Sequence, residues 1–153
     1  MPTPVGTPIR KEISGRVVSY IPSRARRTAF ATPERFGGFA LHADWPETVL
    51  KDRPLDAYTA LVAVTHDPKI DEFPIKAALE TNCFYVGALG SKKTHAKRLE
   101  RLSEAGVSQD RLERIAAPIG LNIGAASPAE IAVATLAQII AAFRKRELVR
   151  DAS

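Results

Sequence analysis

The chain has 153 residues, of which 45% are hydrophobic and 25% are charged, and its formal net charge is +5. This composition is typical of one globular domain with a single core, and it excludes low-complexity and solenoid architectures. Cys83 is the only cysteine, which excludes an intramolecular disulfide and a metal site built from several thiolates of one chain.

Prolines near the start set the expected domain boundaries. Three prolines within residues 1–14 cannot donate to a sheet ladder and disfavour helix, so this stretch predicts an extended tail. We place one domain at residues 15–147 and a short C-terminal tail at residues 148–153.

Short elements dominate the first part of the chain. RVVSYI at 16–21 and FALHA at 39–43 are β-rich runs bounded by proline or glycine, which predicts two short strands. Thr32, followed by proline and glutamate, is typical of a helical turn between them. Residues 44–51 predict a short helix, and the apolar run TALVAV at 59–64 predicts a strand covered on both faces.

The middle of the chain predicts a β-α-β unit. Apolar residues repeat at helical spacing over residues 73–81, with Pro74 at the expected helix start, and the strand-like FYVGAL at 84–89 follows directly. Cys83 precedes this strand, which favours a buried structural thiol; a reactive or sulfur-carrying thiol is the alternative.

Ser91 is the expected N-cap of the next helix. Ala96, Leu99 and Leu102 recur at helical spacing and should face the core, and Gly106 marks the end of this helix. A short helix in SQDRLERI and a strand in IAAPIG are expected to follow.

The last helix carries the clearest start signal. Ser127, Pro128 and Glu130 occupy the N-cap, first and third positions of a capping box. The apolar residues expected to pack on the sheet are Ile131, Leu136, Ile139, Ile140 and Phe143.

The alternation of strands and helices predicts an α/β fold, with a mainly parallel sheet flanked by helices. In such sheets ligands bind outside the carboxyl ends of the strands. Three polar or glycine-bearing segments directly follow predicted strands: residues 65–68, 87–95 and 118–124. They should therefore lie along one edge.

The second of these segments predicts an anion site. Gly87 and Gly90 would let the backbone approach a ligand, and the free amides of the following helix start favour a negative charge. Lys92 and Lys93 lie in the first turn behind Ser91, where the helix dipole disfavours cations unless an anion compensates them. We therefore expect a phosphate here; a tight turn with lysines in water is the alternative.

Thr65, His66 and Asp67 follow the predicted central strand and are candidates to hold a pterin or nucleotide ring. The alternative is that Asp67 only caps a turn. Asn122 offers a donor and an acceptor and is a further candidate ligand contact. No paired base and nucleophile accompany these residues, so we predict no catalytic residue, and the three dispersed histidines predict no metal ligand.

Four motifs occur in the order and approximate spacing of one known family: AFATPERF, TALVAVTHDP, FYVGALGSKKTHAKRLERLSEAG and APIGLNIGAASPAEIAVATLAQIIA. From about residue 29 to about residue 146 the chain resembles the C-terminal Rossmann-like domain of the XdhC/CoxI family. The resemblance implies an accessory protein, more a chaperone than an enzyme. Such a protein would bind molybdenum cofactor, as molybdopterin or its dinucleotide form, protect it during sulfuration and deliver it to a molybdoenzyme of the xanthine dehydrogenase class. A sulfurtransferase is a second implied partner.

One departure from the family pattern concerns the sheet. Only 15 residues precede RVVSYI, so we expect a Rossmann-like sheet that lacks the usual first β-α unit. The gap would close by direct pairing of residues 16–21 with residues 59–64, by an N-terminal segment, or by pairing with another chain. Because unpaired sheet edges favour association, a homodimer is predicted.

A second departure concerns the ligand. The end of RVVSYI lacks the acidic residue that would bind a ribose hydroxyl, which argues against NAD in its usual mode. One alternative function is an NAD(P)-binding oxidoreductase fragment, with Arg24, Arg26 and Arg27 at a 2′-phosphate. Another is a protein-interaction module without a small ligand.

The distribution of charge and apolar residues also limits the partners. The basic residues are spread over several segments without interleaved stacking aromatics, so no nucleic-acid partner is predicted. No stretch approaches the roughly 20 apolar residues of a membrane span, and the N-terminus lacks the apolar core of a secretory signal. We therefore expect a cytoplasmic protein without a membrane partner.

Overall fold

One parallel sheet organises the described part of the chain. A computed structural model describes residue 42 and residues 44–151, with side chains as far as residue 146. The strands predicted at 16–21 and 39–43, and the helical turn between them, lie outside the described residues apart from residue 42. The elements, in chain order, are α2 (Pro46–Asp52), β1 (Ala60–Ala63), α3 (Pro68–Glu80), β2 (Tyr85–Ala88), α4 (Lys92–Glu104), α5 (Gln109–Leu112), β3 (Ile115–Ala116) and α6 (Pro128–Asp151).

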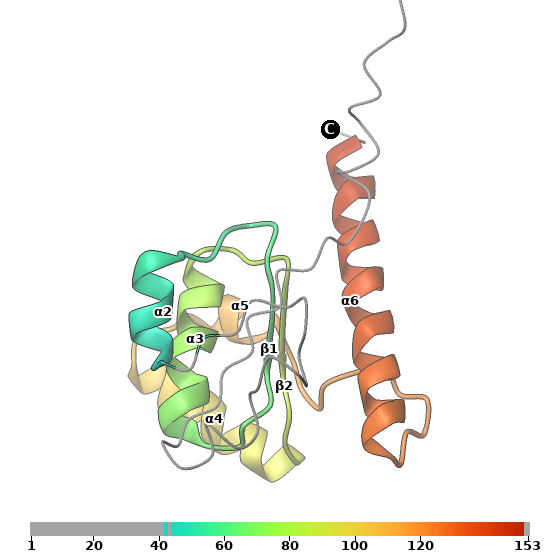
Figure 1. The fold of residues 1–153 in the computed structure, drawn as a ribbon, viewed down its shortest axis with the longest axis horizontal. Helices are drawn as coiled ribbons and strands as arrows, with labels where there is room; N and C mark the ends of the chain where they lie inside the picture. Colours follow the sequence, from blue (N-terminus) through green and yellow to red (C-terminus); the bar gives the residue numbers. More distant parts are fainter. Residues whose placement is uncertain (1–41, 43, 152–153) are drawn as a thin grey trace, which may run out of the picture.

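The three strands run parallel in the order β1-β2-β3. Ala63 of β1 is paired with Ala88 of β2, and Gly87 of β2 is paired with Ala116 of β3. Figure 1 shows α2, α3, α4 and α5 to one side of the strands and α6 on the other. The predicted α/β class, with a parallel sheet flanked by helices, is confirmed.

The main core lies between the sheet and helices α3, α4 and α5. Ile75, Leu79, Val86 and Leu102 are the largest apolar side chains that are fully buried there. Cys83 is buried in the same cluster, and burial raises the pKa of its thiol. The structural role predicted for this cysteine is therefore supported, because a buried thiol with a raised pKa carries little nucleophilic thiolate.

Helix α3 begins at Pro68, so the start predicted near residue 73 was wrong. Asp67 is the N-cap, and its carboxylate accepts a hydrogen bond from the amide of Lys69 at 3.0 Å. Pro74, the predicted first-turn proline, lies inside the helix. Because either proline suits a first turn, only the cap distinguishes the two starts.

Helix α4 is capped as predicted but buries a different face. Ser91 Oγ accepts a hydrogen bond from the amide of Thr94 at 3.1 Å. Leu102 is buried, whereas Ala96, which was predicted to face the core, is exposed. Arg98 occupies the core-facing position instead, and such a buried charge requires specific partners.

The start of α6 matches its sequence signal. Ser127 Oγ accepts from the amide of Glu130 at 3.2 Å, and Glu130 Oε2 accepts from the amide of Ser127 at 3.0 Å. Hydrogen bonds from the backbone lower the pKa of Glu130. The capping box is confirmed, and the helix continues to Asp151, past the domain end expected at residue 147.

Helix α6 uses only part of its apolar surface to cover the sheet. Phe143 is buried and meets Phe84 edge to face, with ring centroids 5.3 Å apart. Leu136 and Ile140 were predicted to pack on the sheet, but they are 53% and 41% exposed. The prediction was wrong for these two because a helix on one sheet buries a single stripe, and apolar residues surround much of this one.

Gly87 makes room for Tyr85 beneath α6. The Tyr85 hydroxyl donates to Gln138 Oε1 of α6 at 2.7 Å, and the amide of Gly120 donates to the same oxygen at 2.9 Å. A Cβ at position 87 would lie 2.5 Å from the Tyr85 hydroxyl and 2.8 Å from Ile119 Cδ1. The glycine is therefore required by packing on the face covered by α6.

We predict that Gly87→Ala lowers the free energy of unfolding of the ligand-free protein by about 1–3 kcal/mol, because the added methyl group overpacks this contact. Urea unfolding measures the loss. In a Tyr85→Ala background the same substitution should cost less, because the principal clash is gone. Equal stability of wild type and Gly87→Ala would contradict the packing assignment.

We also predict that Ser127→Ala destabilises the protein by about 1 kcal/mol, because the amide of Glu130 loses its side-chain cap. Ser103→Ala, at an exposed position within α4, is the matched control and should be neutral or slightly stabilising. Thermal and urea unfolding of both variants report the difference. Indistinguishable effects of the two substitutions would show that the cap contributes nothing.

Candidate functional site

The loops after β1 and β2 leave the sheet at the same edge. Ala63 and Ala88 are paired where the two strands end, and the amide of Leu89 donates to the carbonyl of Ala63 at 2.8 Å. Residues 65–67 and 89–93 therefore follow neighbouring strand ends, as the β-α-β topology predicts. In Figure 1 this is the lower edge of the sheet, where α3 and α4 begin.

Thr65 holds the loop after β1. Its hydroxyl donates to Asp71 Oδ1 at 2.8 Å and accepts from the amide of Asp67 at 3.1 Å. His66 lies between them with a φ of 63°, which is uncommon for a residue with a side chain. The Asp67 carboxylate caps α3, as the alternative interpretation of that residue proposed, whereas His66 is exposed. Of the three predicted residues, His66 is the one whose side chain is most open to a ligand.

The loop after β2 forms an open helix start. Gly90 has a φ of 138°, a conformation that requires glycine. Ser91 caps the amide of Thr94, and within the described residues the amides of Lys92 and Lys93 have no acceptor. Both lysine side chains are exposed. Two N–H donors and two ammonium groups are therefore available to an anion.

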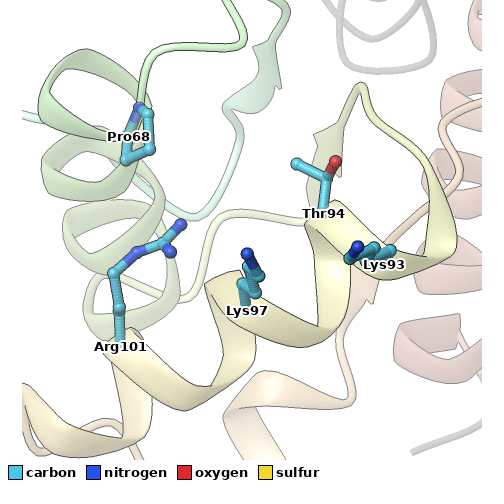
Figure 2. Close-up of a pocket in the computed structure, with 5 residues that line it drawn as sticks. All are labelled: Pro68, Lys93, Thr94, Lys97 and Arg101. Atoms are coloured by element: carbon cyan, nitrogen blue, oxygen red, sulfur yellow. The ribbon is translucent and has the colours of Figure 1, made fainter.

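A groove between α3 and α4 adjoins this helix start and has a volume of about 300 Å³. Within the described part of the chain, Lys93 and Lys97 form no ion pair, whereas Arg101 is paired with Glu72. The groove is therefore positively charged. Its lining residues, drawn in Figure 2, are Pro68 at the start of α3 and Lys93, Thr94, Lys97 and Arg101 on α4.

The structure does not join the remaining two predicted residues to this cluster. Gly87 is buried within β2 rather than in the loop, and its packing requirement explains why a glycine stands there. Asn122 is exposed between β3 and α6, and in the described part of the chain its side chain forms no hydrogen bond to either loop. A ligand contact by either residue stays a prediction.

Sequence reasoning missed two buried charged residues at this edge. Asp71 on α3 and Arg98 on α4 are each 3% exposed. Asp71 lies four residues before the buried Ile75, and Arg98 lies four residues before the buried Leu102. A charged residue on the apolar stripe of a helix is the signal that could have identified both. Lys97, which lines the groove, was also missed.

The exposed groups at this edge are suited to binding an anion. Ser91 Oγ lies 3.0 Å from Thr94 Oγ1, a hydrogen bond between two hydroxyls and not one to a base. Among residue 42 and residues 44–151, no three His, Cys, Asp or Glu side chains are grouped to hold a metal ion. The helices in that same part include none with the length and apolarity needed to cross a bilayer.

Two relatives share part of this sequence. The chain is 36% identical over 85 residues to the molybdenum cofactor insertion chaperone PaoD of Escherichia coli, and the match covers 56% of this chain and 27% of that protein. It is 35% identical over 105 residues to a probable xanthine dehydrogenase protein of Bacillus subtilis, and this match covers 69% of this chain and 29% of the relative. The matched region is thus less than a third of the length of either relative.

A solved structure and a family model cover more of the chain. The crystal structure of a xanthine dehydrogenase from Bacillus halodurans matches with a TM-score of 0.66 and 27% identity, over 84% of this chain and 35% of that one. The family model of the XdhC Rossmann domain matches residues 15–139. This match includes β1, β2, β3 and both loops of the candidate site. The chain therefore belongs to the XdhC family, and its parallel sheet is that of the XdhC Rossmann domain.

Proposed function

We propose that this chain binds molybdenum cofactor, as molybdopterin or its dinucleotide form, at the start of α4. As part of an XdhC protein it would assist the maturation of a molybdoenzyme of the xanthine dehydrogenase class. The family assignment and the names of the two relatives support this class of function. The single observation that carries the site is the helix start after Gly90, where free amides and two lysines share one turn.

The phosphate of the cofactor would lie against the first turn of α4. The N-terminus of a helix carries about half a positive charge, which repels Lys92 and Lys93 until an anion is bound. A phosphate removes this repulsion and accepts from the free amides of the same two residues. Hydrogen bonds from lysine to phosphate are charge-assisted and roughly twice as strong as neutral ones.

The groove beside this turn would hold a further part of the ligand. A volume of about 300 Å³ is at the lower end of the range for small-molecule pockets, so the groove suits a portion of the cofactor. Lys97 supplies a second cation one turn after Lys93, which suits the pyrophosphate of a dinucleotide form. His66, exposed at the neighbouring strand end, is the candidate contact for the ring.

We also propose a sulfurtransferase as a second partner, a cytoplasmic location and a homodimer. The family resemblance supports the first two, and the dimer follows from the edges of the sheet, since within the described residues β1 and β3 are paired on one side only. Size-exclusion chromatography with light scattering should give a mass of two chains at micromolar concentration. The mass of a single chain would contradict the dimer.

The proposed site predicts a loss of cofactor in lysine variants. Protein purified from a host that makes molybdenum cofactor should carry bound cofactor, detected by native mass spectrometry. Lys93→Ala should weaken retention by roughly tenfold, the effect of losing about 1.4 kcal/mol of charge-assisted binding. Lys92→Ala should act in the same direction.

Lys51→Ala is the matched control, because this exposed lysine lies in the last turn of α2, remote from the start of α4 in Figure 1. It should retain cofactor like the wild type. Equal retention by all four proteins would contradict the site assignment. A wild-type protein that never carries cofactor would contradict the proposed function itself.

A further inference from the structure

Asp71 fixes the loop after β1 from inside the protein. Its Oδ1 accepts from the Thr65 hydroxyl, and that hydroxyl in turn accepts from the amide of Asp67. Its Oδ2 has no hydrogen-bond partner within the described residues. Burial raises the pKa of Asp71, while the hydrogen bond from Thr65 and the charge of Arg98 oppose that rise. The charge of this carboxylate therefore depends on Thr65 and Arg98.

Arg98 fixes the loop after β2 in a corresponding way. Its Nη2 donates to the carbonyl of Leu89 at 3.0 Å and lies 3.7 Å from where a Cβ of Gly90 would stand. Its Nη1 has no partner within the described residues. Burial and the charge of Arg98 lower the pKa of His95, which favours the neutral form of that ring. The Arg98 guanidinium thus places a buried positive charge beside the glycine turn.

Asp71 and Arg98 attract each other without forming a direct salt bridge. Buried charged groups stabilise a fold no better than well-packed apolar side chains of similar volume. The hydrogen bonds that these two groups make go to the two loops of the candidate site, one loop each. The loops that they hold therefore explain their presence better than core stability does.

We infer that Asp71 and Arg98 are positioning residues that set the His66 loop and the Gly90 turn relative to each other, so that both address one bound anion. The inference rests on the proposed function, since it assigns a role toward the same site. Neither residue needs to touch the ligand. Arg98 acts through Leu89 and Gly90, and Asp71 acts through Thr65.

Two-dimensional ¹⁵N NMR of the full chain tests this role, with inorganic pyrophosphate as the probe. In the ligand-free protein, Arg98→Met should shift the amide of His66, which belongs to the other loop, and Asp71→Asn should shift the amide of Gly90. Each substitution should weaken pyrophosphate binding about tenfold. The double variant should bind about as weakly as either single variant, because the two residues act as a unit. Arg98→Lys should restore part of the affinity.

Lys76→Met is the matched control. Lys76 Nζ donates to the carbonyl of Ala105 at 2.8 Å and so links the same two helices at the end of α4 away from the site. This variant should change neither loop nor pyrophosphate binding. Should Arg98→Met fail to fold, Asp71→Asn and Arg98→Lys provide the same comparison with smaller changes.

The outcomes separate the two claims. If pyrophosphate binds the wild type and the Asp71 and Arg98 variants equally, or if each substitution shifts only its own loop and the effects add, the positioning role is overturned. If the wild type shows no saturable shifts at Gly90, Lys92 and Lys93, the proposed phosphate site fails. The ligand-free spectra then still show whether the two loops are coupled.

Discussion

The candidate site depends on the parallel register of β1 and β2. Because Ala63 is paired with Ala88, the two strands end together and each passes directly into the loop that starts a helix. A register shifted by one residue would turn Val86 away from the core, so burial of the strand fixes the position of the loops. The geometry of the anion site is in this way a consequence of core packing.

Charge at this edge is arranged in two layers. The outer layer is exposed and cationic, with Lys92, Lys93 and Lys97 on the first turns of α4. The inner layer is buried and mixed, with Asp71 and Arg98 bonded to the two loops. The outer layer supplies attraction for an anion, and the inner layer holds the backbone that presents it. A mobile loop with the same lysines would lose binding free energy to ordering.

Local patterns in the sequence predicted most elements but not the contacts between them. The two apolar strands and the cap at Ser91 depend on neighbouring residues only, and they were predicted correctly. The start of α3 was wrong because Pro68 and Pro74 both suit a first turn, and the choice depends on where β1 ends. Arg98 was missed because its partners lie in other elements. For the same reason Gly87 was interpreted as a ligand contact, although the side chain of Tyr85 explains it.

A crystal structure of the complex with molybdenum cofactor tests the central claim most directly. The account predicts that a phosphate group of the cofactor accepts hydrogen bonds from the amides of Lys92 and Lys93, with the rest of the molecule entering the groove between α3 and α4. A cofactor bound elsewhere on the chain, with the turn at Gly90 free of ligand or covered by other protein atoms, would contradict it.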